Sequence, residues 1–396
     1  MPTVDLKDMQ TATFRANPSY ELVLFDHLPA EQQLAFKDLR QDPAFYGILR
    51  PRAGGRLTLK VVNQDTALLL FALHAPSRVP AYVLGKLGEG WNQTFAELVL
   101  DGVLEIEHEG TFVSGAAARA AIFADGFEPA SRGRVAELSL EALRYAQDLA
   151  IEDPARLAMR LYLYNQLPLT PAWKCRLPAP DAVAAYLGIG PAGACRPLLE
   201  RHWSQNPPSP TNDGWFSWRS RREVRKRSRP SDAPYKLYIS SLVQSVPHAL
   251  QAFLEASGSV QAFAFKIGRD VYGLLRPDKL VVYFPGFEEL AEAADVLADR
   301  LEGCAAHGVP FTAGIAVDGL LSWGVDPPPA AQTPLGLGRE SWRVWITNHV
   351  ARSLASARAV TSSVEPWRFA LERLRLDGVD TDTWTPTGNI WQKFIA

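Results

Sequence analysis

Strand-length apolar runs alternate with stretches of helical spacing between residues 234 and 330. The runs YKLYISS, QAFAFKIG and KLVVYFPG predict strands, and GVPFTAGIAVDGLLSWG predicts a strand or a hairpin that turns at Asp318–Gly319. Between them, VPHALQAFLEASG and FEELAEAADVLADRLEGC repeat apolar residues at the spacing of amphipathic helices. Because these elements follow in the order β-α-β-β-α-β, the segment predicts a layered α+β or α/β domain.

Helix and strand patterns are mixed over residues 1–115. The span Thr94–Gly115 predicts a helix, a break at Asp101–Gly102, and two strands joined by a turn at Glu109–Gly110. A helix followed by such a hairpin is the pattern of a winged helix. Two interpretations stay open for this segment: a peptide-recognition module resembling the leader-binding domains of ribosomal-peptide pathways, or a scaffold.

The middle and the end of the chain complete the expected organisation. Residues 116–203 have mostly helical spacing, and residues 204–233 predict a turn-rich linker with a basic run from Arg219 to Arg229. This run fits a solvated linker, a clamp for an acidic or phosphorylated peptide, or a nucleic-acid patch. We therefore expect an α+β fold in which a winged-helix-like module (1–115), a helical region (116–203) and a basic linker (204–233) precede a mixed-sheet domain with Trp-rich C-terminal helices (234–396).

Composition narrows the function classes. The 396 residues are 47% hydrophobic and 21% charged, with a formal net charge of −2, as in an ordinary globular protein. A global affinity for nucleic acid or membranes is not indicated, so any anion site must be local. Cys175, Cys195 and Cys304 lie far apart without a CxxC pair, which argues against a disulfide framework or a zinc site. Neither a signal pattern nor a run of about 18 apolar residues occurs, so we expect a cytoplasmic protein with no membrane partner.

Basic residues of the strand-rich segment lie on or next to strand edges rather than being spread over solvated faces. They are Lys236, Lys266, Arg269, Arg276 and Lys279. Lys266 follows the apolar run AFAF, where a lysine either extends to solvent or is desolvated, which favours the neutral amine that acts as a base. Arg276 and Lys279 combine an arginine fork with a second cation, which suits a phosphate. From the residue types alone, a structural ion-pair network and an anion site both remain open.

Other polar residues offer fewer indications of chemistry. His307, in AHGVPF, is either an acid or a solvated loop histidine, whereas Asp318 and Asp326 are expected in turns. The stretch GLGRESW lacks the strand–GxGxxG–helix context of a nucleotide site, and no GxSxG motif is present. No metal-ligand spacing is found, so no metal site is expected.

Four short motifs occur in the same order as in a known family. YKLYISSL, AFAFKIG, LLRPDKLVVYF and HGVPFTAGIAVDGLLSWGVDPP resemble the HopA effector family, and the ending with SWRVWITNHVA and PWRFALERLRLDGVD is similar too. The resemblance covers roughly residues 234–396. Members of this family also occur as stand-alone lyases beside kinases in lanthipeptide and thioamitide pathways. More distantly, the segment resembles the lyase domains of class III and class IV lanthipeptide synthetases and the effector phosphothreonine lyases.

The resemblance implies a phosphoserine and phosphothreonine lyase that needs no cofactor. Such an enzyme eliminates phosphate and leaves dehydroalanine or dehydrobutyrine. By this resemblance Lys266 is the general base, and Arg276 and Lys279 bind the phosphate. Tyr238 matches the position of the general acid, where the related synthetases have histidine; a phenol either donates the proton or only hydrogen-bonds the phosphate.

One cationic position of the synthetases has no counterpart here. They carry an arginine in a strand that in this chain is SWG, Ser322–Gly324. Arg269, Lys236 or an arginine of the run Arg219–Arg229 is the candidate to replace it.

The implied partners are a phosphorylated precursor peptide and a separate Ser/Thr peptide kinase, because no HRDxxxxN kinase motif occurs in the chain. Two alternatives stay open beside this lyase of peptide natural product maturation. One is a non-catalytic scaffold that holds a kinase or a precursor peptide, and the other is an effector lyase that acts on phosphoproteins.

Overall fold

The protein folds into two compact units. The computed structural model describes residues 5–52, 59–124, 128–207, 214–222, 234–315, 318–327, 340–360, 364–387 and 390. The first unit comprises Met1–Glu128, Thr333–Gly338 and Arg352–Leu376, and the second comprises Pro129–Gln332, Arg339–Ala351 and Asp377–Ala396. Each unit combines helices with antiparallel sheet, so the fold class is α+β, as the sequence predicted.

The first unit contains two small antiparallel sheets. One sheet has the order β1-β5-β6, formed by Phe14–Ala16, Leu104–His108 and Thr111–Val113. The other has the order β2-β3-β4, formed by Tyr20–Val23, Phe45–Pro51 and Lys60–Asn63. The helices of this unit are α1 (Ala30–Ala35), α2 (Gln64–Ala72), α3 (Ala81–Leu87), α4 (Trp91–Leu100), α5 (Arg119–Ile122) and α15 (Pro366–Leu376).

The predicted helix and hairpin of this unit are present. Helix α4 ends before Gly102, whose φ of +72° is a left-handed conformation that glycine adopts without strain. The turn between β5 and β6 has positive φ at both Glu109 and Gly110, which matches the twist of a tight hairpin. Ser77, which lies between α2 and α3, forms an isolated β-bridge with Phe14 of β1. The element order is therefore that of a winged helix.

Helix α15 belongs to a different unit from the one that the sequence suggested. We expected all of residues 234–396 in one domain, but Arg352–Leu376 groups with the first unit. The reason is the apolar face of α15, since Phe369 and Leu376 join the hydrophobic core built by residues such as Phe95. Sequence spacing shows that a helix has an apolar face but not which core that face covers.

The second unit is built on one seven-stranded sheet of the order β12-β13-β9-β11-β10-β8-β7, with every neighbouring pair antiparallel. The strands are β7 (Trp203–Gln205), β8 (Trp215–Ser220), β9 (Tyr235–Ile239), β10 (Ala264–Gly268), β11 (Leu280–Phe284), β12 (Ala313–Gly314) and β13 (Leu321–Val325). A separate two-stranded sheet pairs β14 (Val379–Asp380) with β15 (Thr385–Pro386).

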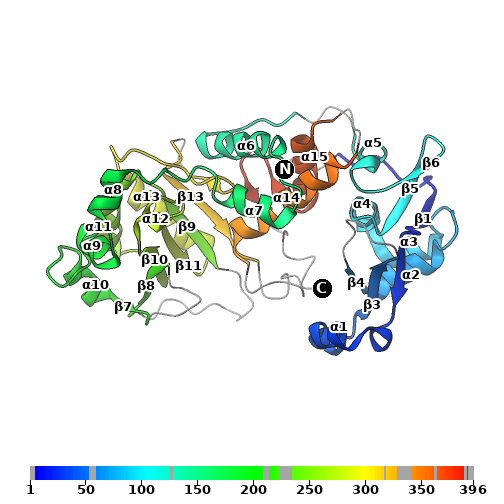
Figure 1. Cartoon of the computed structure of the whole chain (residues 1–396), viewed down its shortest axis with the longest axis horizontal. Helices are drawn as coiled ribbons and strands as arrows, with labels where there is room; N and C mark the ends of the chain where they lie inside the picture. The colour runs from blue at the N-terminus through cyan, green and yellow to red at the C-terminus, as the bar shows by residue number, and fades with distance from the viewer. Residues whose placement is uncertain are drawn as a thin grey trace. The chain divides into compact units, whose positions relative to one another are not determined.

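Helices cover both faces of this sheet (Figure 1). The larger core lies under α8 (Pro171–Arg176), α9 (Pro180–Tyr186), α10 (Arg196–His202), α11 (Val246–Ala256), α12 (Val271–Leu275) and α13 (Phe287–Arg300). On the other face lie α6 (Arg134–Gln147), α7 (Pro154–Tyr162) and the start of α14 (Trp342–Arg358). The order β9-α11-β10-α12-β11-α13-β12-β13 contains the predicted alternation, with the short helix α12 added between β10 and β11.

The segment expected to be a linker supplies the edge strand β7 and its neighbour β8 instead. Residues 204–233 include most of β7 and all of β8, which pairs with β10. The alternation in WFSWRS explains this, because Trp218 turns inward and stacks on Phe265 with a centroid distance of 4.7 Å. Arg221 and Arg222, at the start of the basic run, donate to the carbonyl groups of Trp203 and Ser257. The rest of that run, residues 223–229, lies outside the described residues.

Candidate functional site

One row of side chains crosses the sheet on the face that α6 and α7 cover. Strand register aligns Ser217, Lys266, Val281, Tyr238 and Ser322 on β8, β10, β11, β9 and β13. The residues next to them in each strand point into the larger core, so this row points to the opposite face. Adjacent strands lie about 4.8 Å apart, which puts the Cα atoms of Lys266 and Tyr238 roughly 10 Å apart with β11 between them.

Two cations share one indole ring at this face. Lys266 is partly exposed, and its Nζ lies 4.1 Å from the ring centroid of Trp215. The guanidinium carbon of Arg276 lies 5.1 Å from the centroid of the same ring. Lys266 also hydrogen-bonds the phenol of Tyr283; burial raises the pKa of that phenol, while the lysine charge opposes the increase. The structure thus brings together the predicted base and one predicted phosphate ligand.

A buried carboxylate organises the arginines behind Trp215. Asp278 accepts hydrogen bonds from Nε and Nη2 of Arg276, each at 2.9 Å, and from the hydroxyl of Tyr162 at 3.0 Å. Burial alone would raise the pKa of Asp278, but Arg343 and Arg276 together hold it well below the usual range. The pKa of Tyr162 rises to about 12 because the phenol is buried beside this carboxylate. With two guanidinium groups on one carboxylate, the cluster keeps a net positive charge.

Arg343 is a buried cation that sequence reasoning missed. Its side chain is 1% exposed, and Nη1 lies 2.9 Å from Oδ2 of Asp278. At this distance Nη1 is an ion-pair partner of the carboxylate, although it forms no well-aligned hydrogen bond among the described residues. The guanidinium is held by the carbonyl groups of Tyr162 and Pro310 and lies 4.5 Å from the Tyr162 ring.

Tyr238, the predicted acid, is buried on the same face. Burial, with a smaller contribution from Asp326, raises the pKa of its phenol well above the ordinary value, so the proton stays on it at neutral pH. Beside it in register, the hydroxyl of Ser322 is buried without a hydrogen-bond partner in the described part of the chain.

Lys236 and Asp326 form an ion pair that anchors α14. Nζ of Lys236 lies 2.6 Å from Oδ2 of Asp326, and both side chains are 7% exposed. The other carboxylate oxygen of Asp326 accepts from the backbone N–H of Trp342, the first residue of α14. Asp326 was expected as a turn residue, and it is instead a buried charge at a helix start. The charge of Lys236 is therefore already balanced within the fold.

Lys279, unlike Lys266, is enclosed within the second unit. It is fully buried, and its Nζ donates to the carbonyl of Ser241 at 2.8 Å and to Nδ1 of His307 at 2.7 Å. Nε2 of His307 lies 2.6 Å from the carbonyl of Asn165, so the ring carries its proton there. The predicted phosphate contact of Lys279 has no open path, and His307 is not the solvated loop residue that was one expectation for it.

Arg269 and the SWG strand are the remaining positions for which the sequence suggested a role in phosphate binding. Arg269 lies at the far end of β10, where its backbone N–H donates to Gly214 and its guanidinium carbon is 6.0 Å from the Phe216 ring rather than the Trp215 ring. The SWG strand supplies no cation to this face: Ser322, at the position of the missing arginine, carries a buried hydroxyl, and a Cβ on Gly324 would overlap the indole of Trp342. Arg343, the residue after Trp342, brings a guanidinium to the Asp278 cluster from α14 instead.

Sequence reasoning missed Trp215, Tyr162, Asp278 and Arg343. Trp215 was hidden in the supposed linker, and the other three come from elements far apart in the chain. The one signal available was the tryptophan and arginine content of WFSWRS and SWRVW, which is unusual for solvated segments.

Among the residues that the structure describes, no group of three or more His, Cys, Asp or Glu side chains could hold a metal ion. None of the described helices has the length and apolar character that crossing a membrane requires.

Comparisons with known proteins give only remote likenesses. No family model and no curated protein sequence matches the chain. Among solved structures, an effector protein from Pseudomonas syringae pv. tomato strain DC3000 is 12% identical with a TM-score of 0.38, over 64% of this chain and 98% of that one. An effector protein from Pseudomonas syringae pv. syringae strain 61 is 11% identical with a TM-score of 0.40, over 64% and 99%. At these values the likeness assigns neither a family nor an activity.

Proposed function

We propose that the second unit is a phosphoserine and phosphothreonine lyase that eliminates phosphate from a phosphorylated peptide without a cofactor. The observation that carries the proposal is the convergence of Lys266 and Arg276 on the Trp215 ring, on the sheet face that also bears Tyr238. A partly exposed amine, a guanidinium and a protonated phenol on one face are the groups that a phosphate β-elimination requires.

Lys266 would act as the base. Its neutral amine takes the proton from Cα of the phosphorylated residue, the electron pair of that C–H bond forms the Cα–Cβ double bond, and the Cβ–O bond breaks. The Trp215 ring contacts Nζ of Lys266 from one side, and Tyr283 hydrogen-bonds it. These two contacts restrict the position of Nζ relative to the substrate.

Arg276 and Arg343 would stabilise the leaving phosphate. Asp278 fixes both guanidinium groups, and the charge that it leaves uncompensated attracts an anion. The side chain of Arg276 is 22% exposed, whereas that of Arg343 is 1% exposed. Arg276 therefore contacts the phosphate, and Arg343 acts through Asp278 as a positioning residue.

Tyr238 would donate the proton that the departing phosphate accepts. Its raised pKa keeps the phenol protonated under the conditions in which the lysine acts as a base. Tyr238 faces the same side of the sheet as Lys266 with β11 between them, but it is only 3% exposed, so its phenol reaches the phosphate only if peptide binding opens this part of the face.

A phosphopeptide-binding module without catalysis is the second candidate. It is favoured by the pairing of Arg276 and Arg343 with Asp278, which builds a fixed anion site whether or not Lys266 works as a base. In either case the phosphate must come from a separate kinase, and a precursor peptide or a phosphoprotein is the partner that we propose.

Mass spectrometry of a phosphothreonine peptide tests the lyase. We expect the wild type to release phosphate and leave a dehydrobutyrine, and Lys266→Ala to lower that rate by roughly 100-fold or more. Lys174→Ala, at an exposed lysine of α8, is the matched control and keeps full activity. If phosphate stays on the peptide while the wild type binds it and Lys266→Ala binds it equally well, the binding module is the correct function.

A further inference from the structure

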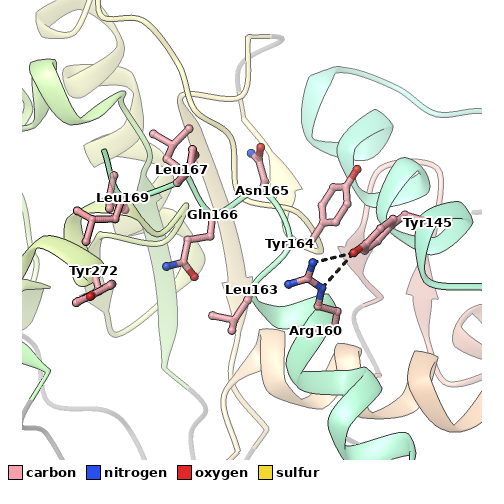
Figure 2. Close-up of a pocket in the computed structure, with 11 residues that line it drawn as sticks. Tyr145, Arg160, Leu163, Tyr164, Asn165, Gln166, Leu167, Leu169 and Tyr272 are labelled. Carbon is pink, nitrogen blue, oxygen red and sulfur yellow. Dashed lines mark hydrogen bonds between the residues drawn. The ribbon is translucent and has the colours of Figure 1, made fainter. Parts of the chain in front are cut away.

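A pocket of about 390 Å³ opens on the second unit between α7 and α12 (Figure 2). This volume is within the range of pockets that hold a small ligand or one side chain of a larger ligand. The lining residues are Tyr145, Arg160, Leu163, Tyr164, Asn165, Gln166, Leu167, Pro168, Leu169, Tyr272 and Leu275. None of the groups assigned to the proposed elimination lies in this wall.

The pocket wall and the phosphate site are built on the same two stretches of backbone. Leu163 follows Tyr162 in the chain, and Leu275 precedes Arg276. Consecutive Cα atoms are about 3.8 Å apart, so the pocket wall begins one residue from the two side chains that hold Asp278. A peptide whose phosphate contacts Arg276 therefore has a neighbouring residue within reach of the pocket.

The wall of the pocket is fixed before any ligand binds. Asn165 adopts a positive φ of 66°, and its Nδ2 donates to the carbonyl groups of His307 and Gly308, each at 3.0 Å. The backbone N–H of Leu167 donates to the carbonyl of Leu275 at 3.0 Å. A wall held by such bonds lowers the ordering cost of binding.

Arg160 is the cationic side chain in the pocket wall. Its Nε and Nη2 both donate to the hydroxyl of Tyr145, at 3.1 and 2.9 Å. Figure 2 shows the third guanidinium nitrogen turned away from Tyr145, toward the side where Leu163 and Gln166 lie. Five N–H groups are available on a guanidinium, so the outer edge formed by Nη1 and Nη2 stays open to a bidentate acceptor. Among the residues that the structure describes, the Arg160 guanidinium is bonded to the Tyr145 hydroxyl and to no carboxylate.

The surrounding groups favour an anionic side chain with an apolar stem. The Gln166 carboxamide has no hydrogen-bond partner in the described ranges of the chain and is a further donor. Leu163 and Leu167 supply apolar surface beside these donors. Glu141, which acts on the neighbouring Tyr164, is itself 3.7 Å from Arg134, so its charge is offset.

We infer that this pocket is a substrate subsite that binds an anionic side chain, a carboxylate or a second phosphate, next to the phosphorylated residue. The inference rests on the proposed function for the identity of the peptide as substrate. The subsite would make the protein select phosphopeptides that carry an acidic residue near the elimination site.

Short alanine-rich phosphothreonine peptides test the subsite. Each peptide carries one substitution at one position that flanks the central phosphothreonine. The substituted residue is Glu, Gln or a second phosphothreonine. At one position we expect the Glu or the doubly phosphorylated peptide to have a KM about ten-fold below that of the Gln peptide, with kcat unchanged. Comparison of KM between the Glu peptide and the doubly phosphorylated peptide identifies the anion that the pocket prefers.

Arg160→Gln should abolish this preference by raising KM for the anionic peptide alone. Arg156→Gln, one turn earlier on α7 and also exposed, is the matched control and should leave the preference intact. If the Glu and Gln peptides behave alike at every position, or the preference survives in Arg160→Gln, the subsite does not exist.

Fluorescence anisotropy with labelled peptides on Lys266→Ala separates the subsite from the lyase. A preference for the anionic peptide that depends on Arg160 in this background supports the subsite even if the wild type releases no phosphate. Equal binding of anionic and Gln peptides there overturns the subsite even if the wild type is an active lyase.

Discussion

The side-chain amine of Lys279 donates a hydrogen bond to Nδ1 of His307 across 2.7 Å in the interior of the second unit. Burial lowers the pKa of Lys279 to about 7, although Asp278 opposes the shift. Burial and the neighbouring lysine lower the pKa of His307 to about 4. The fold therefore encloses two bases whose neutral forms are favoured by burial, which makes the free energy of unfolding depend on pH.

Stability should rise with pH over two separate ranges. Both bases have a lower pKa in the folded state than their ordinary values of 10.5 and 6.5, so between the two values the unfolded chain binds more protons. The free energy of unfolding should thus increase from pH 4 to 6.5 through His307, and from pH 7 to 10.5 through Lys279. Urea unfolding at a series of pH values measures this slope.

Lys279→Met isolates the lysine contribution. The variant should lose the increase in stability between pH 7 and 10.5, because the buried group that titrates there is gone. Lys174→Met, at an exposed position of α8, should keep the wild-type slope. An unchanged slope in Lys279→Met would show that the lysine is solvated in solution.

Asp278→Asn should destabilise the second unit strongly. The change leaves Arg343 buried with no carboxylate partner, and removing one partner of a buried ion pair costs about 3–5 kcal/mol. Asp318→Asn is the comparison, since this carboxylate accepts from the backbone N–H of Leu320 two residues along, in a turn. Thermal unfolding measures both, and equal melting temperatures would contradict the role of Asp278 as the organiser of the arginines.

Trp215 and Trp218 should differ in what their loss affects. Trp218→Ala removes the ring that stacks on Phe265 in the core and should cost about 3–5 kcal/mol of stability. Trp215→Ala should leave stability nearer to that of the wild type and reduce phosphate release about ten-fold or more, because Lys266 and Arg276 lose their common support. Chemical unfolding and the phosphate assay on both variants make the comparison, and a Trp215→Ala variant with full activity argues against the proposed site.

Gly324→Ala should destabilise by about 1–3 kcal/mol, since the added methyl group overlaps the indole of Trp342 and overpacks the start of α14. Gly258→Ala is the control, because a Cβ there meets nothing within 4 Å. Differential scanning calorimetry distinguishes the two. Similar melting temperatures for Gly324→Ala and the wild type would mean that Trp342 can move aside.

The pattern of apolar residues by itself determined the strands β9, β10, β11 and β13, the helices between them, and the helix and hairpin of the first unit. These elements are local, because side-chain period and turn residues depend on neighbours in the chain. The pattern also placed Lys266 and Tyr238 on strands, and their common face follows from the antiparallel register.

Only the tertiary structure decided which cations are open and which are already paired. Lys236, Lys279 and Arg276 look alike in the sequence, yet one is bound to Asp326, one is enclosed with His307, and one, although paired with Asp278, also reaches the Trp215 ring. Their partners lie 28 to 90 positions away along the chain or on another element, and no local pattern encodes such a contact. The same holds for Arg343 and for α15, because the choice of core for an apolar face depends on the whole fold.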